Sequence, residues 1–162
     1  MNRTKPEANG AKAATRGAAE KEIRILIVDD HAIIRQGLRQ ILSTAFTKAE
    51  FGEASSANEA LEVVAKQRWD VVLLDINLPQ LNGLEVLAKL KAAHPKLPVI
   101  VVSVESKPET LVQASELGAD GYVLKHLPRE KIIQRLSEVF DSIEEATDGE
   151  ISDEGSGSTP AV

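Results

Sequence analysis

Polar side chains follow four apolar stretches of the sequence, each at the point where the stretch ends. Two adjacent acids, Asp29 and Asp30, follow "IRILIV", and Asp75 follows "DVVLL". Ser103 follows "PVIVV", and Lys125 follows "GYVL". Each residue alone has a simpler explanation, such as a helix cap, a solvated turn or a surface lysine. A shared chemical role therefore requires a fold that brings the five side chains together.

Three carboxylates, one hydroxyl and one ammonium would form a site suited to phosphate chemistry. Clustered carboxylates repel one another and raise each other's pKa unless a cation lies among them. Oxygen ligands, with no cysteine in the chain and no histidine at suitable spacing, favour a hard ion such as Mg²⁺, or Mn²⁺ in its place. Mg²⁺ commonly bridges carboxylate and phosphate, and a carboxylate can itself be the nucleophile that accepts a phosphoryl group.

The elements that would position these residues alternate between short apolar strands and amphipathic helices. Strands are expected within residues 23–28, 49–56, 70–74, 98–102 and 121–124. The helical stripes are Ile33, Ile34, Gly37, Leu38, Ile41 and Leu42; Ala60, Leu61 and Val64; Val86, Leu87 and Leu90; Leu111, Ala114 and Ser115; and Ile132, Ile133, Leu136, Val139, Phe140 and Ile143.

This alternation predicts an α/β fold with a parallel sheet and helices on both faces. Five strand–helix units favour an open, doubly wound sheet, because a closed barrel of this kind needs eight. The carboxyl ends of parallel strands meet at one edge, and ligands of open α/β sheets bind outside that edge. The five polar residues should therefore converge.

Local signals place the ends of several helices. Ser56 with Glu59, and Ser106 with Glu109, have the spacing of capping boxes at the starts of the second and fourth helices. Gly118 should end the fourth helix. His31 is expected to start the first helix and to have no chemical role.

Composition and charge predict one folded domain between two terminal segments of different charge. The chain has 162 residues and a net charge of -6, and residues 141–162 hold seven acidic residues and no basic ones. We expect a flexible leader at 1–22, a folded domain at 23–143 and a disordered acidic Gly/Ser-rich tail at 144–162. No basic surface typical of nucleic-acid binding is evident, and no apolar run has the length of a signal peptide or membrane span, which favours the cytoplasm.

The chemistry-bearing segments closely resemble the receiver domain of bacterial response regulators. The matching segments are "ILIVDDHAIIRQGL", "DVVLLDINLPQLNGLEVL", "PVIVVSVES" and "LGADGYVLK". The sequence of these segments is most similar to the subfamily that usually carries a helix-turn-helix output domain, which the sequence lacks after Phe140. The resemblance implies the strand order 2-1-3-4-5.

The resemblance also implies roles at the metal and phosphoryl site. Asp75 matches the phosphoacceptor. Asp30 and Asp75 would give carboxylate oxygens to Mg²⁺, Asn77 would give its backbone carbonyl, and Asp29 would act mainly through a metal-bound water. Lys125 would contact the phosphoryl group and Asp75.

Further positions match the family's switch and timing residues. Ser103 would hydrogen-bond the phosphoryl group, and Tyr122 would turn inward as Ser103 moves, which shifts the population of a bistable element. Asn77 and Glu105 are similar to the pair found in a fast-resetting chemotaxis regulator, which implies a short-lived phosphoryl group.

The resulting hypothesis is a signalling receiver in a two-component phosphorelay. It would accept a phosphoryl group on Asp75 from a histidine kinase or histidine phosphotransfer protein and catalyse only its own Mg²⁺-dependent phosphorylation and dephosphorylation. It would act as a single-domain regulator on a downstream protein through its fourth helix, fifth strand and fifth helix, with phosphorylation-dependent dimerisation as one outcome and with no nucleic acid or membrane partner.

Two alternatives are an aspartate-nucleophile phosphatase, for which Asn77 is a poor substitute for a general acid, and a truncated transcription factor whose receiver only dimerises.

Overall fold

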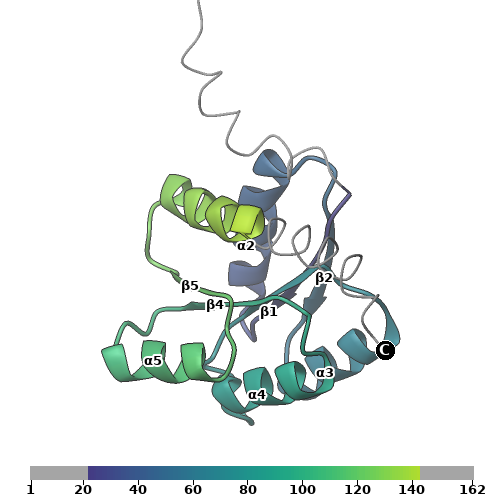
Figure 1. The fold of residues 1–162 in the computed structure, drawn as a ribbon. Coiled ribbons are helices and arrows are strands. Elements are labelled where there is room, and N and C mark those ends of the chain that lie inside the picture. Colours follow the sequence, from purple (N-terminus) through teal and green to yellow (C-terminus); the bar gives the residue numbers. More distant parts are fainter. Residues whose placement is uncertain (1–21, 143–162) are drawn as a thin grey trace, which may run out of the picture.

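The computed structural model describes residues 22–142, in which strands and helices alternate along the chain (Figure 1). The elements are β1 (Arg24–Val28), α2 (Ala32–Ala45), β2 (Glu50–Ala54), α3 (Ala57–Lys66), β3 (Val71–Leu74), α4 (Gly83–Ala93), β4 (Val99–Ser103), α5 (Pro108–Glu116) and β5 (Gly121–Leu124). A C-terminal helix occupies residues 129–142. Most of the predicted leader, the predicted tail and Ile143 lie outside the described residues.

The five strands form one parallel sheet in the order β2-β1-β3-β4-β5, which confirms the predicted fold. From β1 the chain runs first to β2 on one side and then to β3 on the other, so the order reverses between β1 and β3. The register aligns Val28 with Leu74, the last residues of these two strands. Asp29 and Asp75 therefore leave the sheet side by side at the switch point, and the Asp75 N–H donates to the Val28 carbonyl at 2.9 Å.

Helices cover both faces of the sheet, and each face has its own apolar cluster. In Figure 1, α2 and the C-terminal helix lie on one side, and α3, α4 and α5 lie on the other. On the first side, the rings of Phe46 and Phe140 are 4.9 Å apart and join α2 to the C-terminal helix. Both rings are buried, and loss of either one would cost about 3–5 kcal/mol of stability.

Two of the predicted helical stripes include residues that are exposed. Ile33 is 75% exposed, whereas Leu38 and Leu42 are buried. The buried stripe of α2 continues through Ile34, and Ile33 lies about 100° around the helix from it. All three residues of the fourth stripe lie in α5 as predicted, but only Ala114 is buried, and Leu111 and Ser115 are exposed.

Of the two predicted capping boxes, the one at Ser56 marks a helix start and the one at Ser106 does not. The Ser56 side chain caps α3 by accepting from the Glu59 N–H, although the Glu59 carboxylate accepts from the Ser55 N–H rather than from that of Ser56. The helix α5 has no such box at Ser106, because its N-cap is Lys107, which makes no side-chain cap bond. Pro108 sets the first helical turn and holds the preceding residue in an extended conformation, which moves the start past Ser106.

The end of α5 follows the prediction. Gly118 follows Leu117, the C-cap of this helix, and has φ +101°, a left-handed conformation that glycine adopts without strain. Among residues 22–142, no helix combines the length and apolar character needed to cross a membrane.

Candidate functional site

The carboxyl edge of the sheet brings together the five polar residues that the sequence singled out. Asp29, Asp75 and Ser103 are 1%, 2% and 0% exposed, and each follows or ends a buried strand. Carboxylate oxygens of Asp29, Asp30 and Asp75 lie within 4.8 Å of one another. The three acids thus form a compact group at the point where β1 and β3 end.

Lys125 lies between two of these carboxylates. Its Nζ is 2.5 Å from Asp29 Oδ2 and donates to Asp75 Oδ2 at 3.1 Å. The backbone fixes this position, because the Lys125 N–H donates to the Ser103 carbonyl at 2.8 Å. Burial alone would lower the pKa of Lys125, but the bonds and negative charges of Asp29 and Asp75 raise it overall. The sequence interpretation anticipated the contact with Asp75 but not the one with Asp29.

Asp75 is held in a partly neutralised environment. Burial raises its pKa, and the neighbouring negative charge of Asp29 adds to that effect. The Asn77 N–H, which donates to Asp75 Oδ1 at 3.0 Å, and the Lys125 ammonium lower the pKa without reversing the shift. Both oxygens of Asp75 therefore have a defined donor, and the rotation of the carboxylate is fixed.

The residues at this edge fit a divalent cation. Three carboxylates face one ammonium, which leaves an excess of two negative charges (3 − 1 = 2) in a largely buried group. Asp30 Oδ1 is buried and accepts no hydrogen bond from the residues that the structure describes, so it is available as a ligand. An all-oxygen set of this charge suits Mg²⁺. A contribution from the Asn77 backbone carbonyl remains a prediction.

Ser103 is hydrogen-bonded to the loop that follows β3 and to the loop that follows β4. Its Oγ accepts from the Asn77 side-chain amide at 3.4 Å and from the Glu105 N–H at 3.0 Å. The hydroxyl still has a proton to donate. The three residues therefore connect the loop after β3 with the loop after β4, beside Asp75.

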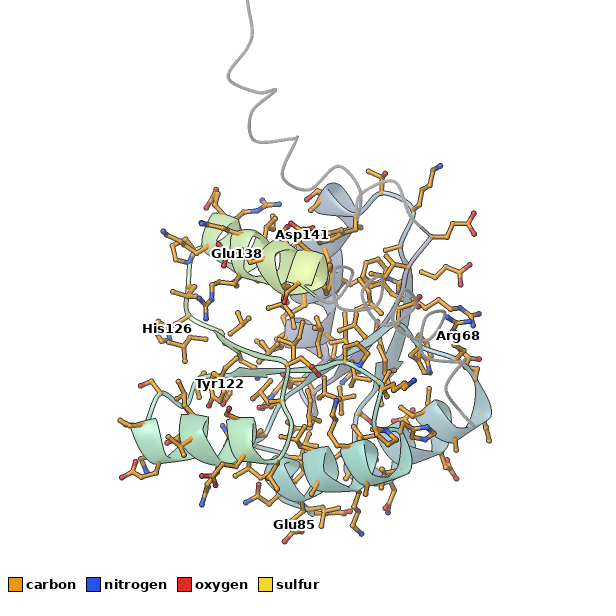
Figure 2. The ribbon with its side chains drawn as sticks, in the orientation of Figure 1. Arg68, Glu85, Tyr122, His126, Glu138 and Asp141 are labelled. Carbon is orange, nitrogen blue, oxygen red and sulfur yellow. The ribbon has the colours of Figure 1, made fainter. Side chains whose placement is uncertain are left out.

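Tyr122 lies on β5, on the side of the sheet that faces α5 (Figure 2). Its hydroxyl donates to the Glu105 carbonyl at 2.8 Å, so the side chain is turned toward the loop after β4. Burial raises the pKa of Tyr122, the Ser103 hydroxyl lowers it, and the charges of Glu105 and Asp75 raise it further. This aromatic side chain is thus in contact with the segment that carries Ser103, while its role as a switch remains a prediction.

His31, to which the sequence analysis assigned no chemical role, borders the acidic group. It is the N-cap residue of α2, as expected, and its N–H donates to Asp29 Oδ1 at 2.9 Å. Its Nδ1 is 3.2 Å from Oδ1 of both Asp29 and Asp30. The signal that could have indicated this contact is the direct succession of the three residues at a strand end.

Gly83 positions the loop after β3 through its backbone. A Cβ at this position would lie 2.1 Å from Ile76 Cα and 2.8 Å from the Asp75 carbonyl oxygen, and the Gly83 N–H donates to the Ile76 carbonyl at 3.0 Å. Only glycine allows the start of α4 to approach the backbone beside Asp75 so closely. Its sequence signal is the "NG" pair just before the third helical stripe.

Comparisons with known proteins agree with this geometry. Residues 25–137 match the family model of the response regulator receiver domain. The nitrate/nitrite response regulator protein NarL of Escherichia coli is 38% identical over 112 residues, which cover 69% of this chain and 52% of that protein. The chain spans about half the length of the curated relatives it matches.

Solved structures extend the likeness to the fold. A CheY-like receiver domain protein from Methanospirillum hungatei has a TM-score of 0.71 and 31% identity, covering 78% of this chain and 99% of that one. A CheX-CheY-BeF3-Mg²⁺ complex from Borrelia burgdorferi has a TM-score of 0.69 and 27% identity, covering 73% of this chain and 89% of that one.

Proposed function

The chain belongs to the response regulator receiver domain family of two-component signalling, and we propose that it accepts a phosphoryl group on Asp75 in a Mg²⁺-dependent reaction. The donor would be a histidine kinase or a histidine phosphotransfer protein. The observation that carries the proposal is the setting of Asp75, a buried carboxylate oriented by two donors inside a group with two excess negative charges.

In the proposed reaction an oxygen of Asp75 attacks the phosphorus atom. The P–N bond of a phosphohistidine breaks, its electron pair leaves with the imidazole, and an acyl phosphate forms on Asp75. The Asn77 N–H and Lys125 hold the carboxylate in one orientation for this attack, so that the protein contributes mostly positioning. Asp29, Asp30, Asp75 and the Asn77 carbonyl would hold Mg²⁺, which when bound neutralises charge on the transferred group.

Lys125 and Ser103 would then hold oxygens of the phosphoryl group. Lys125 already lies 3.1 Å from the Asp75 carboxylate, and the Ser103 hydroxyl, whose oxygen accepts from Asn77 and Glu105, can donate its proton to this bond. A shift of Ser103 would pull on the Glu105 segment, to which the Tyr122 hydroxyl is bonded. Dephosphorylation requires water to reach Asp75, and Asn77 and Glu105 at the rim would set its rate.

The output would be a contact with a protein effector. Four large apolar side chains are exposed on α5 and its flanking loops, namely Val104, Leu111, Val112 and Leu117. They lie on the side of the sheet from which Tyr122 extends toward the phosphorylation site. We propose that the effector binds at α5, β5 and the C-terminal helix, and the exposed apolar side chains support the α5 part of this surface. A cytoplasmic location, action as a single domain and dimerisation on phosphorylation belong to the same proposal.

Intact mass spectrometry with a small phosphoryl donor tests this function. The 162-residue chain should gain the mass of one phosphoryl group when Mg²⁺ is present and gain none when it is chelated. Asp75→Ala should not gain mass. Asp70→Ala is the matched control, because Asp70 is an aspartate that precedes the same strand and should leave labelling intact. Equal mass gain in the native chain and in Asp75→Ala would refute the assignment.

A further inference from the structure

Arg35 joins the acidic group to the edge strand of the sheet. Its Nη1 donates to the backbone carbonyl of Asp29 at 2.7 Å, and its Nε donates to Glu53 Oε1 at 2.8 Å. The Arg35 side chain is 15% exposed, so the guanidinium is held within the structure rather than in solvent. One rigid, forked side chain therefore connects the turn after β1 to β2.

The carbonyl that Arg35 holds belongs to the peptide group between Asp29 and Asp30. Rotation of that peptide group would change the direction of both carboxylates, because it is flanked by ψ of Asp29 and φ of Asp30. Glu53 provides a firm anchor, since it lies on β2 in register with Ile27 of β1. The bond from Arg35 thus resists a rotation that would disperse the carboxylate oxygens.

We propose that Arg35, anchored by Glu53, is a positioning residue that aims the Asp29 and Asp30 carboxylates at the cation. The inference rests on the proposed function, because it assumes that these carboxylates bind Mg²⁺. It goes beyond that function in assigning control of metal affinity to a side chain that contacts neither the metal nor the phosphoryl group.

Electrostatics alone predicts the opposite effect. Arg35 is a positive charge near a cation site, so its removal should strengthen Mg²⁺ binding if only the field of the protein mattered. Loss of an orienting partner should weaken binding instead. The direction of the change therefore separates positioning from simple charge.

The chain offers a matched control on the same helix. Arg39 Nη1 donates to Glu53 Oε2 at 3.4 Å, and the Arg39 side chain is 55% exposed. Arg39→Gln removes the same charge and the same kind of partner from Glu53 but leaves the Asp29 carbonyl bond in place. Arg35→Lys keeps the charge and removes the fork, so that one ammonium cannot reproduce both bonds.

Titration of the full chain with MgCl2, followed by backbone amide NMR shifts near Asp30 and Asn77, measures the affinity. Arg35→Gln should weaken Mg²⁺ binding by about tenfold, the lower end of the cost of losing a partner that orients a metal ligand. Arg39→Gln should stay within about twofold of the native chain, because it leaves the turn untouched. The Mg²⁺ affinity of Arg35→Lys should lie between those of the other two variants. This variant replaces Arg35→Gln in the test if the spectrum of Arg35→Gln is that of an unfolded chain.

Unchanged or tighter binding in a folded Arg35→Gln chain would overturn the inference, and so would equal weakening in Arg39→Gln. Absence of Mg²⁺ binding in the native chain would instead refute the proposed function. The two failures are therefore distinguishable in one experiment.

Discussion

Replacing Lys125 with methionine removes the ammonium that lies between the Asp29 and Asp75 carboxylates. Methionine is close to lysine in length and keeps the apolar part of the side chain in place. The two carboxylates are 1% and 2% exposed, so water cannot take over the role of the ammonium. We expect Lys125→Met to fold but to be less stable, and to depend more strongly on Mg²⁺.

The distances set the size of this effect. At an effective dielectric constant of about 20, a charge pair at 3.1 Å attracts by about 5 kcal/mol, and the pair at 2.5 Å attracts by somewhat more. Loss of the desolvation penalty of Lys125 cancels much of this sum, because the side chain is only 13% exposed. A net loss of about 3 kcal/mol without Mg²⁺ is therefore expected, the lower end for breaking a buried pair.

Mg²⁺ should restore part of the lost stability. The variant site has three carboxylates and no ammonium, so we expect it to bind the cation about tenfold more tightly than the native site does. A ligand that binds only the folded state stabilises it in proportion to the logarithm of its affinity, which adds about 1.4 kcal/mol for the variant. The difference between the two chains should therefore fall to about half at saturating Mg²⁺.

Urea unfolding near neutral pH provides the assay. Trp69 is the single tryptophan of the chain and is buried two residues before β3, whereas Asp75 follows the other end of that strand, so its fluorescence should report unfolding rather than metal binding. Lys107→Met is the control, because that lysine is 74% exposed and 3.6 Å from Glu105. The free energy of unfolding of Lys107→Met should stay within about 0.5 kcal/mol of the native value. Equal losses for Lys125→Met in chelator and in Mg²⁺ would refute the reasoning.

Three further predictions concern other parts of the site. Gly83→Ala should cost about 3 kcal/mol in urea unfolding and slow phosphorylation, because its Cβ would lie 2.1 Å from Ile76 Cα; native stability would contradict the close approach. The hydrogen bond from Arg35 lowers the pKa of Glu53 below its usual 4.5, so NMR titration of Arg35→Gln should find it raised toward that value. Since the folded pKa is the lower one, the stability that this pair contributes is present above pH 4.5 and lost as pH falls through the folded pKa. The phosphoryl group, timed by intact mass after donor removal, should decay within minutes rather than hours, and persistence would contradict the assignment of Asn77.

The sequence was sufficient to predict where the carboxylates, Ser103 and Lys125 meet. Their convergence follows from parallel strands alone, because the carboxyl ends of such strands share one edge. The helix periodicity was less informative about which residues of the helices are buried and where α5 begins. Ile33 fits the apolar spacing but lies on the flank of α2, and Pro108 displaced the helix start expected at Ser106.

The contacts that the sequence did not predict depend on side-chain direction. Lys125 reaches Asp29 because the carboxylate of Asp29 is turned toward the end of β5. His31 contacts both acids because its N–H donates to Asp29 and its Nδ1 lies beside an oxygen of each. Arg35 lies six residues after Asp29, and its bond to the Asp29 carbonyl depends on the position at which α2 begins. Spacing identifies such residues as neighbours but does not give the direction of their donors.

The central claim is that Asp75 itself becomes the acyl phosphate. Borohydride reduces an acyl phosphate on aspartate to homoserine, so treatment after labelling, followed by peptide mapping, marks the acceptor. We predict homoserine at position 75 of the chain and at no other acid of the group. Homoserine at Asp29 or Asp30, or a phosphoryl group retained on a serine or histidine with Asp75 unchanged, would contradict the account.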